Sequence, residues 1–136
     1  MQRWIRSTTE GLCVALVLLA ASGALAQSAE TKAKALFKRG QTAYNAGDFE
    51  KAIGLYQEAY QLKPLPGFLF NIAQGYRQAG NFERAQFFFS RFVDTAQPRD
   101  PNLDTARALL AEVNEKERAR LSQQKAQDEN ARLEAE

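Results

Sequence analysis

Residues 46–52 read Ala46-Gly47-Asp48-Phe49-Glu50-Lys51-Ala52, and residues 79–85 read Ala79-Gly80-Asn81-Phe82-Glu83-Arg84-Ala85. Five of the seven positions are identical, and the other two exchange Asp for Asn and Lys for Arg. The two glycines are 33 residues apart. A repeat of this period is typical of proteins that stack one supersecondary unit on the next.

The motif predicts a sharp reversal between two helices. Glycine can adopt the left-handed conformation that ends a helix. Asp48 and Asn81 are good N-cap residues, and Glu50 and Glu83 follow in the first turn, where the helix dipole favours negative charge. A connection this short joins antiparallel helices. The alternative, a coincidental Gly-Asp turn, is disfavoured because two copies agree over seven positions.

The N-terminus has the pattern of a secretory signal peptide. Arg3 and Arg6 precede a largely apolar run over residues 12–26, which ends in Ala-Leu-Ala. We expect cleavage between Ala26 and Gln27, and export of the protein to the periplasm or the medium. The alternative is an uncleaved membrane anchor, although the run of 15 residues is short of the ~18 that a spanning helix needs.

Removal of residues 1–26 would leave 110 residues, enough for about one domain. Lys plus Arg would fall from 18 to 16 and Asp plus Glu from 16 to 15, so the net charge would be about +1. This balance is no argument for a nucleic acid or anionic lipid partner. Cys13 would be lost with the leader, so no disulfide is expected, and its position does not suit a lipid anchor.

Apolar residues at helical spacing predict an all-α fold. We expect helices over about residues 32–46, 49–62, 67–79 and 82–96, followed by a fifth that starts with Asp100 as N-cap and Pro101 as its first residue. The residues expected to face the core are Ala33, Leu36, Gly40, Ala43, Ala52, Leu55, Tyr56, Ala59, Leu62, Leu69, Ile72, Ala73, Tyr76, Ala85, Phe88, Phe89, Phe92, Leu103, Ala106, Leu110 and Val113. Residues 27–115 would form this domain, and the charged residues 116–136 would be a solvated helical extension or a disordered tail.

These repeats resemble tetratricopeptide repeats, which are helical pairs of about 34 residues. The slots of that motif fall in the first copy on Leu36, Arg39, Gly40, Ala43, Ala52, Tyr56, Ala59 and Pro64, and in the second on Leu69, Ile72, Ala73, Tyr76, Ala85, Phe89, Phe92 and Pro98. Arg39, Ala43 and Phe92 depart from the usual Leu, Tyr and Ala. The resemblance implies two stacked hairpins in a short right-handed solenoid, with Gly40 and Ala73 at close helix contacts.

Two repeats are fewer than the three or more that a stable stack normally needs. The resemblance implies a capping helix, and Ala106, Leu110 and Val113 of the fifth helix are the expected cover for the fourth. Phe92 would fill the space between these two helices. Self-association through the tail is the alternative cover.

The resemblance also implies a concave binding groove lined by the first helix of each pair. The positions concerned are Phe37, Gln41, Tyr44 and Asn45 in the first pair, and Phe70, Gln74, Arg77 and Gln78 in the second. Rings beside amides suit a peptide or a helix. The alternative is that Phe37, Tyr44 and Phe70 simply pack against neighbouring helices.

Two further features carry less weight. Asn71 matches one position of a carboxylate-gripping variant of the family, but Phe37 and Gln41 replace the expected Lys and Asn, so that activity is not carried over. Phe87 lies off the apolar stripe between Arg84 and Arg91, as a second contact site or as an ordinary exposed residue.

An enzyme is not expected, because the chain beyond the leader has no His or Cys, and no pair of acids facing a cleft is visible. No cofactor or metal is predicted. The preferred hypothesis is an adaptor in the cell envelope that binds a protein or peptide, without nucleic acid and without membrane insertion after cleavage. The alternative is a structural subunit that forms homo-oligomers through its C-terminal helix.

Overall fold

The computed structural model describes residues 27–135, and within this range every regular element is a helix. The first helix covers residues 27–45, followed by α2 (Phe49–Leu62), α3 (Pro66–Gln78), α4 (Phe82–Thr95) and α5 (Leu103–Ala135). The expected signal peptide and the cleavage point between Ala26 and Gln27 lie in or at the edge of the part that is not described. None of the helices within residues 27–135 is long and apolar enough to cross a bilayer.

The two sequence motifs form the same turn. Gly47 and Gly80 have positive φ angles of 80° and 76°. The Asp48 N–H donates to the Ala43 carbonyl at 2.9 Å, and the Gly47 N–H donates to that of Tyr44 at 3.0 Å. This pair of bonds is the Schellman arrangement, which satisfies carbonyls that a helix end would leave free.

The second copy repeats these bonds. The Asn81 N–H donates to the Tyr76 carbonyl at 2.9 Å, and the Gly80 N–H donates to the Arg77 carbonyl at 3.2 Å. Each motif also starts the next helix, since the side chains of Asp48 and Asn81 accept from the main-chain N–H three residues later. One residue therefore closes one helix with its N–H and caps the next with its side chain, which makes the reversals as short as predicted.

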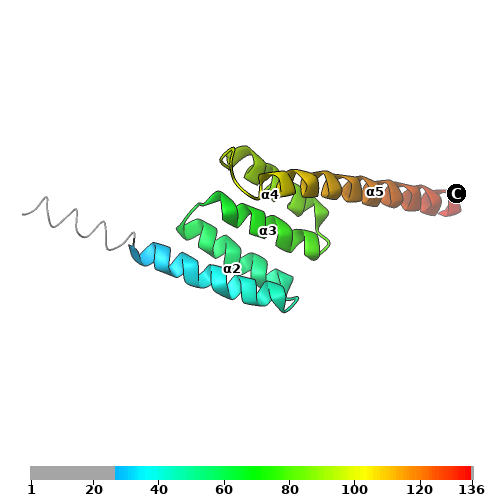
Figure 1. The fold of residues 1–136 in the computed structure, drawn as a ribbon. Helices are drawn as coiled ribbons and strands as arrows, with labels where there is room; N and C mark the ends of the chain where they lie inside the picture. The colour runs from blue at the N-terminus through cyan, green and yellow to red at the C-terminus, as the bar shows by residue number, and fades with distance from the viewer. Residues whose placement is uncertain (1–26, 136) are drawn as a thin grey trace, which may run out of the picture.

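Successive helices pack side by side, with α3 between α2 and α4, and α4 against both α3 and α5 (Figure 1). The turns at residues 46–48 and 79–81 make each hairpin antiparallel. An ion pair between Lys63 and Glu30, 3.0 Å apart, joins the first helix to the end of α2. The all-α fold of stacked hairpins predicted from the repeat is confirmed.

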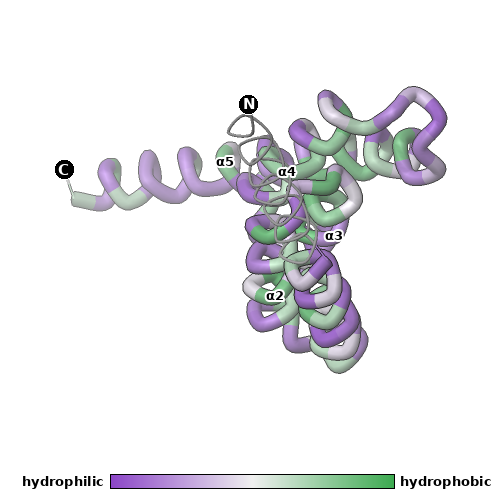
Figure 2. Tube along the Cα trace, turned by 90° about the vertical axis from the view of Figure 1, so that its left-hand side faces the viewer, coloured by the Kyte–Doolittle hydropathy of each residue, from purple (hydrophilic) through white to green (hydrophobic). Residues whose placement is uncertain are grey.

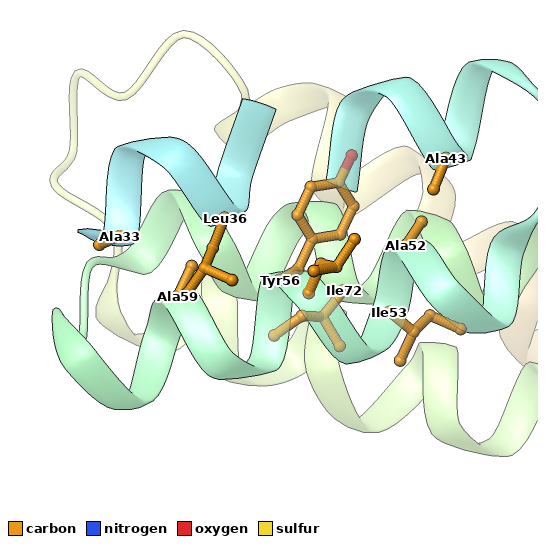
Figure 3. Close-up of a cluster of buried hydrophobic side chains, with 9 residues drawn as sticks. Ala33, Leu36, Ala43, Ala52, Ile53, Tyr56, Ala59 and Ile72 are labelled. Carbon is orange, nitrogen blue, oxygen red and sulfur yellow. The ribbon is translucent and has the colours of Figure 1, made fainter. Parts of the chain in front are cut away.

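Small residues bring the first helix and α2 close together. Figure 3 shows Ala43 facing Ala52 and Leu36 facing Ala59 across this interface. Tyr56 is almost wholly buried, and a Cβ atom placed on Gly40 would lie 2.6 Å from its Cε1 atom. This confirms the predicted close contact at Gly40, because any larger residue would meet the ring.

A second cluster joins α3, α4 and α5. Its fully buried members include Phe89, Phe92, Ala106 and Val113. Phe92 thus fills the space against α5 as predicted, although Leu110 is only half-buried. Burying large apolar side chains here contributes roughly 1.5–3 kcal/mol each, so α5 covers the face of α4 that would otherwise be open.

The predicted start of the fifth helix was wrong. The Asp100 side chain accepts from the Asn102 N–H at 2.9 Å and so caps a tight turn that contains Pro101. The helix begins two residues later, at Leu103. An Asp side chain can bond the N–H two residues on as easily as it caps a helix, and here the turn is formed.

Beyond Glu117 the last helix leaves the helical stack. Residues 118–135, here called the tail, are exposed on every side and still helical (Figure 2). Helix and disorder were the two alternatives left open by the sequence, and the structure has helix up to Ala135. Leu121 and Leu133 are its exposed large apolar residues.

Candidate interaction surface

The four predicted groove residues of the first helix divide into two kinds. Gln41 and Asn45 are exposed. Phe37 and Tyr44 are half-buried, because each ring packs on another. Phe37 lies 5.7 Å from both Tyr56 and Phe68, and Tyr44 lies 5.4 Å from Phe49, measured between ring centroids.

Of the four predicted residues of α3, Gln78 is exposed and the other three are half-buried. Gln74 accepts from Arg77 Nε at 3.1 Å. Phe70 packs on Phe89 and Phe92 at 5.9 and 5.4 Å between ring centroids. The ring of Phe70 therefore belongs largely to the second core cluster.

The three aromatic residues thus make the helix contacts that the sequence left open as an alternative. A Phe70→Ala change would remove core contacts as well as surface, so it cannot serve as a clean test of binding. The amides remain as groups that can reach a partner. Asn71 donates its amide to the Gly67 carbonyl at 2.7 Å, within its own helix.

The comparison with known families matches residues 33–65 to the tetratricopeptide repeat. The matched segment contains the first helix from Ala33, the Gly47 turn and α2, which form the first hairpin. The first hairpin therefore matches a tetratricopeptide repeat. Repeats of this family generally mediate protein–protein interaction, and the family is typically a non-enzymatic scaffold. A comparison with curated proteins found no match.

An ion pair connects α3 to α5 at one of the predicted groove residues, Arg77. Arg77 of α3 pairs with Glu112 of α5 at 3.3 Å, and Lys116 pairs with the same carboxylate at 2.6 Å. The ammonium group of Lys116 and then the Arg77 guanidinium hold the pKa of Glu112 below its ordinary value, against the effect of burial. Glu112 therefore links α5 to Arg77 of α3.

Three hollows in the described part of the chain lie away from the eight predicted residues. One of about 350 Å³ is formed where the 79–81 turn meets Glu117 and Arg120 of α5. Two others, of about 310 and 170 Å³, lie along the outer seam of the first hairpin, near Leu55 and Leu62. None of these three hollows is lined by any of the eight residues.

Glu117 is a residue that the sequence reading missed. It is 9% exposed and accepts two bonds from Arg120, at 2.9 Å from Nε and 2.6 Å from Nη2. The guanidinium lowers the pKa of Glu117 and outweighs burial. A signal was present, because Glu117 continues the stripe of Leu103, Ala106, Leu110 and Val113 at spacings of three and four. Glutamate is rarely buried without a partner, so the predicted stripe stops at Val113.

Proposed function

We propose that this protein is an adaptor in the cell envelope that holds a peptide or helix of a partner protein on its concave side. The observation that carries the proposal is the exposure of three amide side chains, Gln41 and Asn45 on the first helix and Gln78 on α3. They stand beside half-buried rings on helices that the family uses for binding.

The chemistry of this surface favours main-chain recognition. An amide side chain can donate to a carbonyl and accept from an N–H, so it can bond to the backbone of an extended segment whatever its sequence. Phe37 and Tyr44 on the same helix pack on other rings but are only half-buried, so part of each side chain remains accessible. Rings of this kind supply apolar contact area with little loss of side-chain freedom.

The exported location rests on the signal-peptide pattern of residues 1–26. N-terminal sequencing of the protein purified from cells that express the full chain tests it. A start at Gln27, together with recovery in the envelope or medium fraction, supports export. An intact N-terminus in the cytosolic fraction contradicts it.

Site-specific photo-crosslinking tests the binding surface. A photoreactive amino acid replaces Gln41, Asn45 or Gln78 in the protein expressed in its own cells, and Gln61 on α2 is the matched control because it is an equally polar exposed residue. The proposal expects one and the same adduct from the three positions and none from the control. Adducts that form only at Gln61, or that differ at every position, contradict it.

Amide-deletion variants then separate specific binding from mere proximity. The Gln41→Ala/Asn45→Ala double variant should fold normally, since both side chains are exposed, and should lose the adduct at position 78. Each backbone-bonding amide is expected to contribute about 0.5–1.5 kcal/mol, so the pair should weaken capture by about tenfold. Undiminished capture would exclude the amides from recognition.

A further inference from the structure

An exposed phenylalanine on α4 is flanked by two arginines. Phe87 is 48% exposed. The guanidinium carbons of Arg84 and Arg91 lie 5.8 and 5.7 Å from the centroid of its ring. The three residues, here called the α4 patch, are spaced by three and four positions and so share one side of the helix.

The α4 patch has no internal acidic counterpart. Within residues 27–135, none of the ion pairs involves Arg84 or Arg91. Both side chains are exposed. The Arg91 guanidinium lies over the Phe87 ring, and that of Arg84 lies over Phe87 and, slightly closer at 5.4 Å, over Tyr76 and Phe88. The patch therefore presents two positive charges on either side of an apolar centre, which is complementary to an apolar residue between two acids.

The tail has this complementary pattern. Leu133 is 62% exposed, Glu129 lies four residues before it, and Glu136 follows it by three in the sequence. The α4 patch has its arginines three residues before and four residues after Phe87. The spacing is three then four around Phe87 and four then three around Leu133, so opposite charges align only when the two helices run antiparallel. Leu133 then lies on Phe87, and Glu129 lies on Arg91, about 6 Å along the helix at 1.5 Å per residue.

The tail cannot reach the α4 patch of its own chain. The last helix is continuous from Leu103 to Ala135 and passes the 79–81 turn before it leaves the stack, pointing away from α4 (Figure 1). Residues 118–135 extend about 27 Å beyond the last buried residue, at 1.5 Å per residue. A contact with α4 therefore requires a second copy.

We propose that the tail of one copy docks antiparallel on the α4 patch of a second copy, with Leu133 on Phe87 and Glu129 on Arg91. The tail and α4 run in opposite directions within one chain (Figure 1). An antiparallel contact between copies thus points all tails the same way. The contact is head-to-tail, so an open assembly of any length keeps one free tail at one end and one free α4 patch at the other, unless it closes into a ring. The contact uses α4 and the tail, not the three exposed amides, and stands independently of the proposed adaptor function.

Sedimentation equilibrium tests the pairing with charge swaps. The protein purified from cells that express the full chain should show an average mass that rises with concentration between about 10 µM and 1 mM, as expected of a small interface. Arg91→Glu and Glu129→Arg should each raise the dissociation constant by about tenfold or more, because like charges then face each other. An equimolar mixture of the two variants should associate again, since each tail then meets an opposite charge on the other variant.

The controls are Arg99→Glu and Glu115→Arg, which make the same charge changes at exposed positions outside the contact and should associate as the wild type does. A wild-type mass that stays at one protomer up to 1 mM overturns the proposal. So does an Arg91→Glu variant that associates like the wild type, which would indicate tails pairing with each other. A mixture that fails to associate overturns it as well.

Disulfide trapping provides a second measurement that does not depend on the charge variants. The only native cysteine, Cys13, is first changed to Ser. Phe87→Cys and Leu133→Cys variants, mixed and oxidised, should give a crosslinked pair of the two variants. The double variant Phe87→Cys/Leu133→Cys should give a ladder of multimers, because the contact is head-to-tail. The arrangement is contradicted if the mixture gives no crosslink between positions 87 and 133. It is also contradicted if the products of the double variant stop at two chains.

Discussion

The Cγ1 atom of Ile53 in α2 occupies the space where a side chain on Gly75 of α3 would begin. A Cβ atom on Gly75 would lie only 2.6 Å from it, and both residues are buried. This contact joins the two hairpins, since α2 ends the first and α3 begins the second. The two repeats can therefore pack this closely only because residue 75 is a glycine and has no side chain.

We expect Gly75→Ala to destabilise the protein by about 1–3 kcal/mol, the usual cost of overpacking a core. Its measure is the midpoint of urea unfolding. Gly54→Ala is the matched control, because a Cβ there would have no neighbour within 4 Å and alanine favours a helix interior by roughly 0.5–1 kcal/mol. Equal effects of the two changes would show that the contact with Ile53 has no energetic weight.

Removing Cγ1 of Ile53 should relieve the clash. We expect Ile53→Ala alone to cost about 2–5 kcal/mol, and to cost less in the Gly75→Ala background, because the added methyl group then gains room. A double-mutant cycle of unfolding free energies measures the difference. Strict additivity would mean that the two side chains do not compete for the same space.

Phe89 and Phe87 offer a comparison of two phenylalanines on one helix. Phe89 is completely buried in the second cluster, so Phe89→Ala should destabilise the protein by ~3–5 kcal/mol. Phe87→Ala should change stability by at most about 0.5 kcal/mol, since that ring is half-exposed. Thermal unfolding followed by circular dichroism checks both, and similar melting points for the two variants would contradict the assigned burial.

The reversals should be sensitive to both of their residues. Gly80→Ala is expected to cost about 1–2 kcal/mol, because φ at this position is positive. Asn81→Ala should cost about 1 kcal/mol through the lost cap to the Arg84 N–H, whereas Asn81→Asp should be tolerated, since Asp48 makes the same cap in the first repeat. Denaturant unfolding of the three variants tests this order.

Acid should loosen the contact between α3 and α5. The pKa of Glu112 is lowered from its ordinary 4.5, so its charged form favours the folded state. The stabilisation is complete above the unfolded pKa and is lost as pH falls from about 4.5 through the lower folded value. Glu112→Gln should therefore melt at a lower temperature than the wild type at pH 7, and the gap should narrow below pH 4. A gap that does not change with pH would contradict this coupling.

The fold followed closely from local rules. The repeated Gly-Asp and Gly-Asn motifs placed the helix ends within one or two residues at the reversals, because positive φ and capping are properties of a few adjacent residues. The start of α5 was predicted two residues too early, because an Asp side chain can cap either a helix or a tight turn, and Asp100 caps a turn. Periodicity also identified most buried positions, since a helix face repeats every three or four residues.

The surface was less accessible to the same reasoning. The sequence put Phe37, Tyr44 and Phe70 on a groove, and the structure shows how much of each ring is used in packing. The sequence placed Glu117 in a solvated extension, whereas Arg120 pairs with it and both lie beside the 79–81 turn. Exposure is a property of what lies opposite a residue, which spacing along one helix does not report.

The sequence by itself thus determined where the described chain reverses and which side of each helix is apolar, because these depend on neighbours within four residues. The tertiary structure alone decided which contacts join the hairpins, as Ile53 on Gly75, and which groups stay free to bind. Those depend on the distance between helices that are tens of residues apart in the chain, and that distance is set by packing.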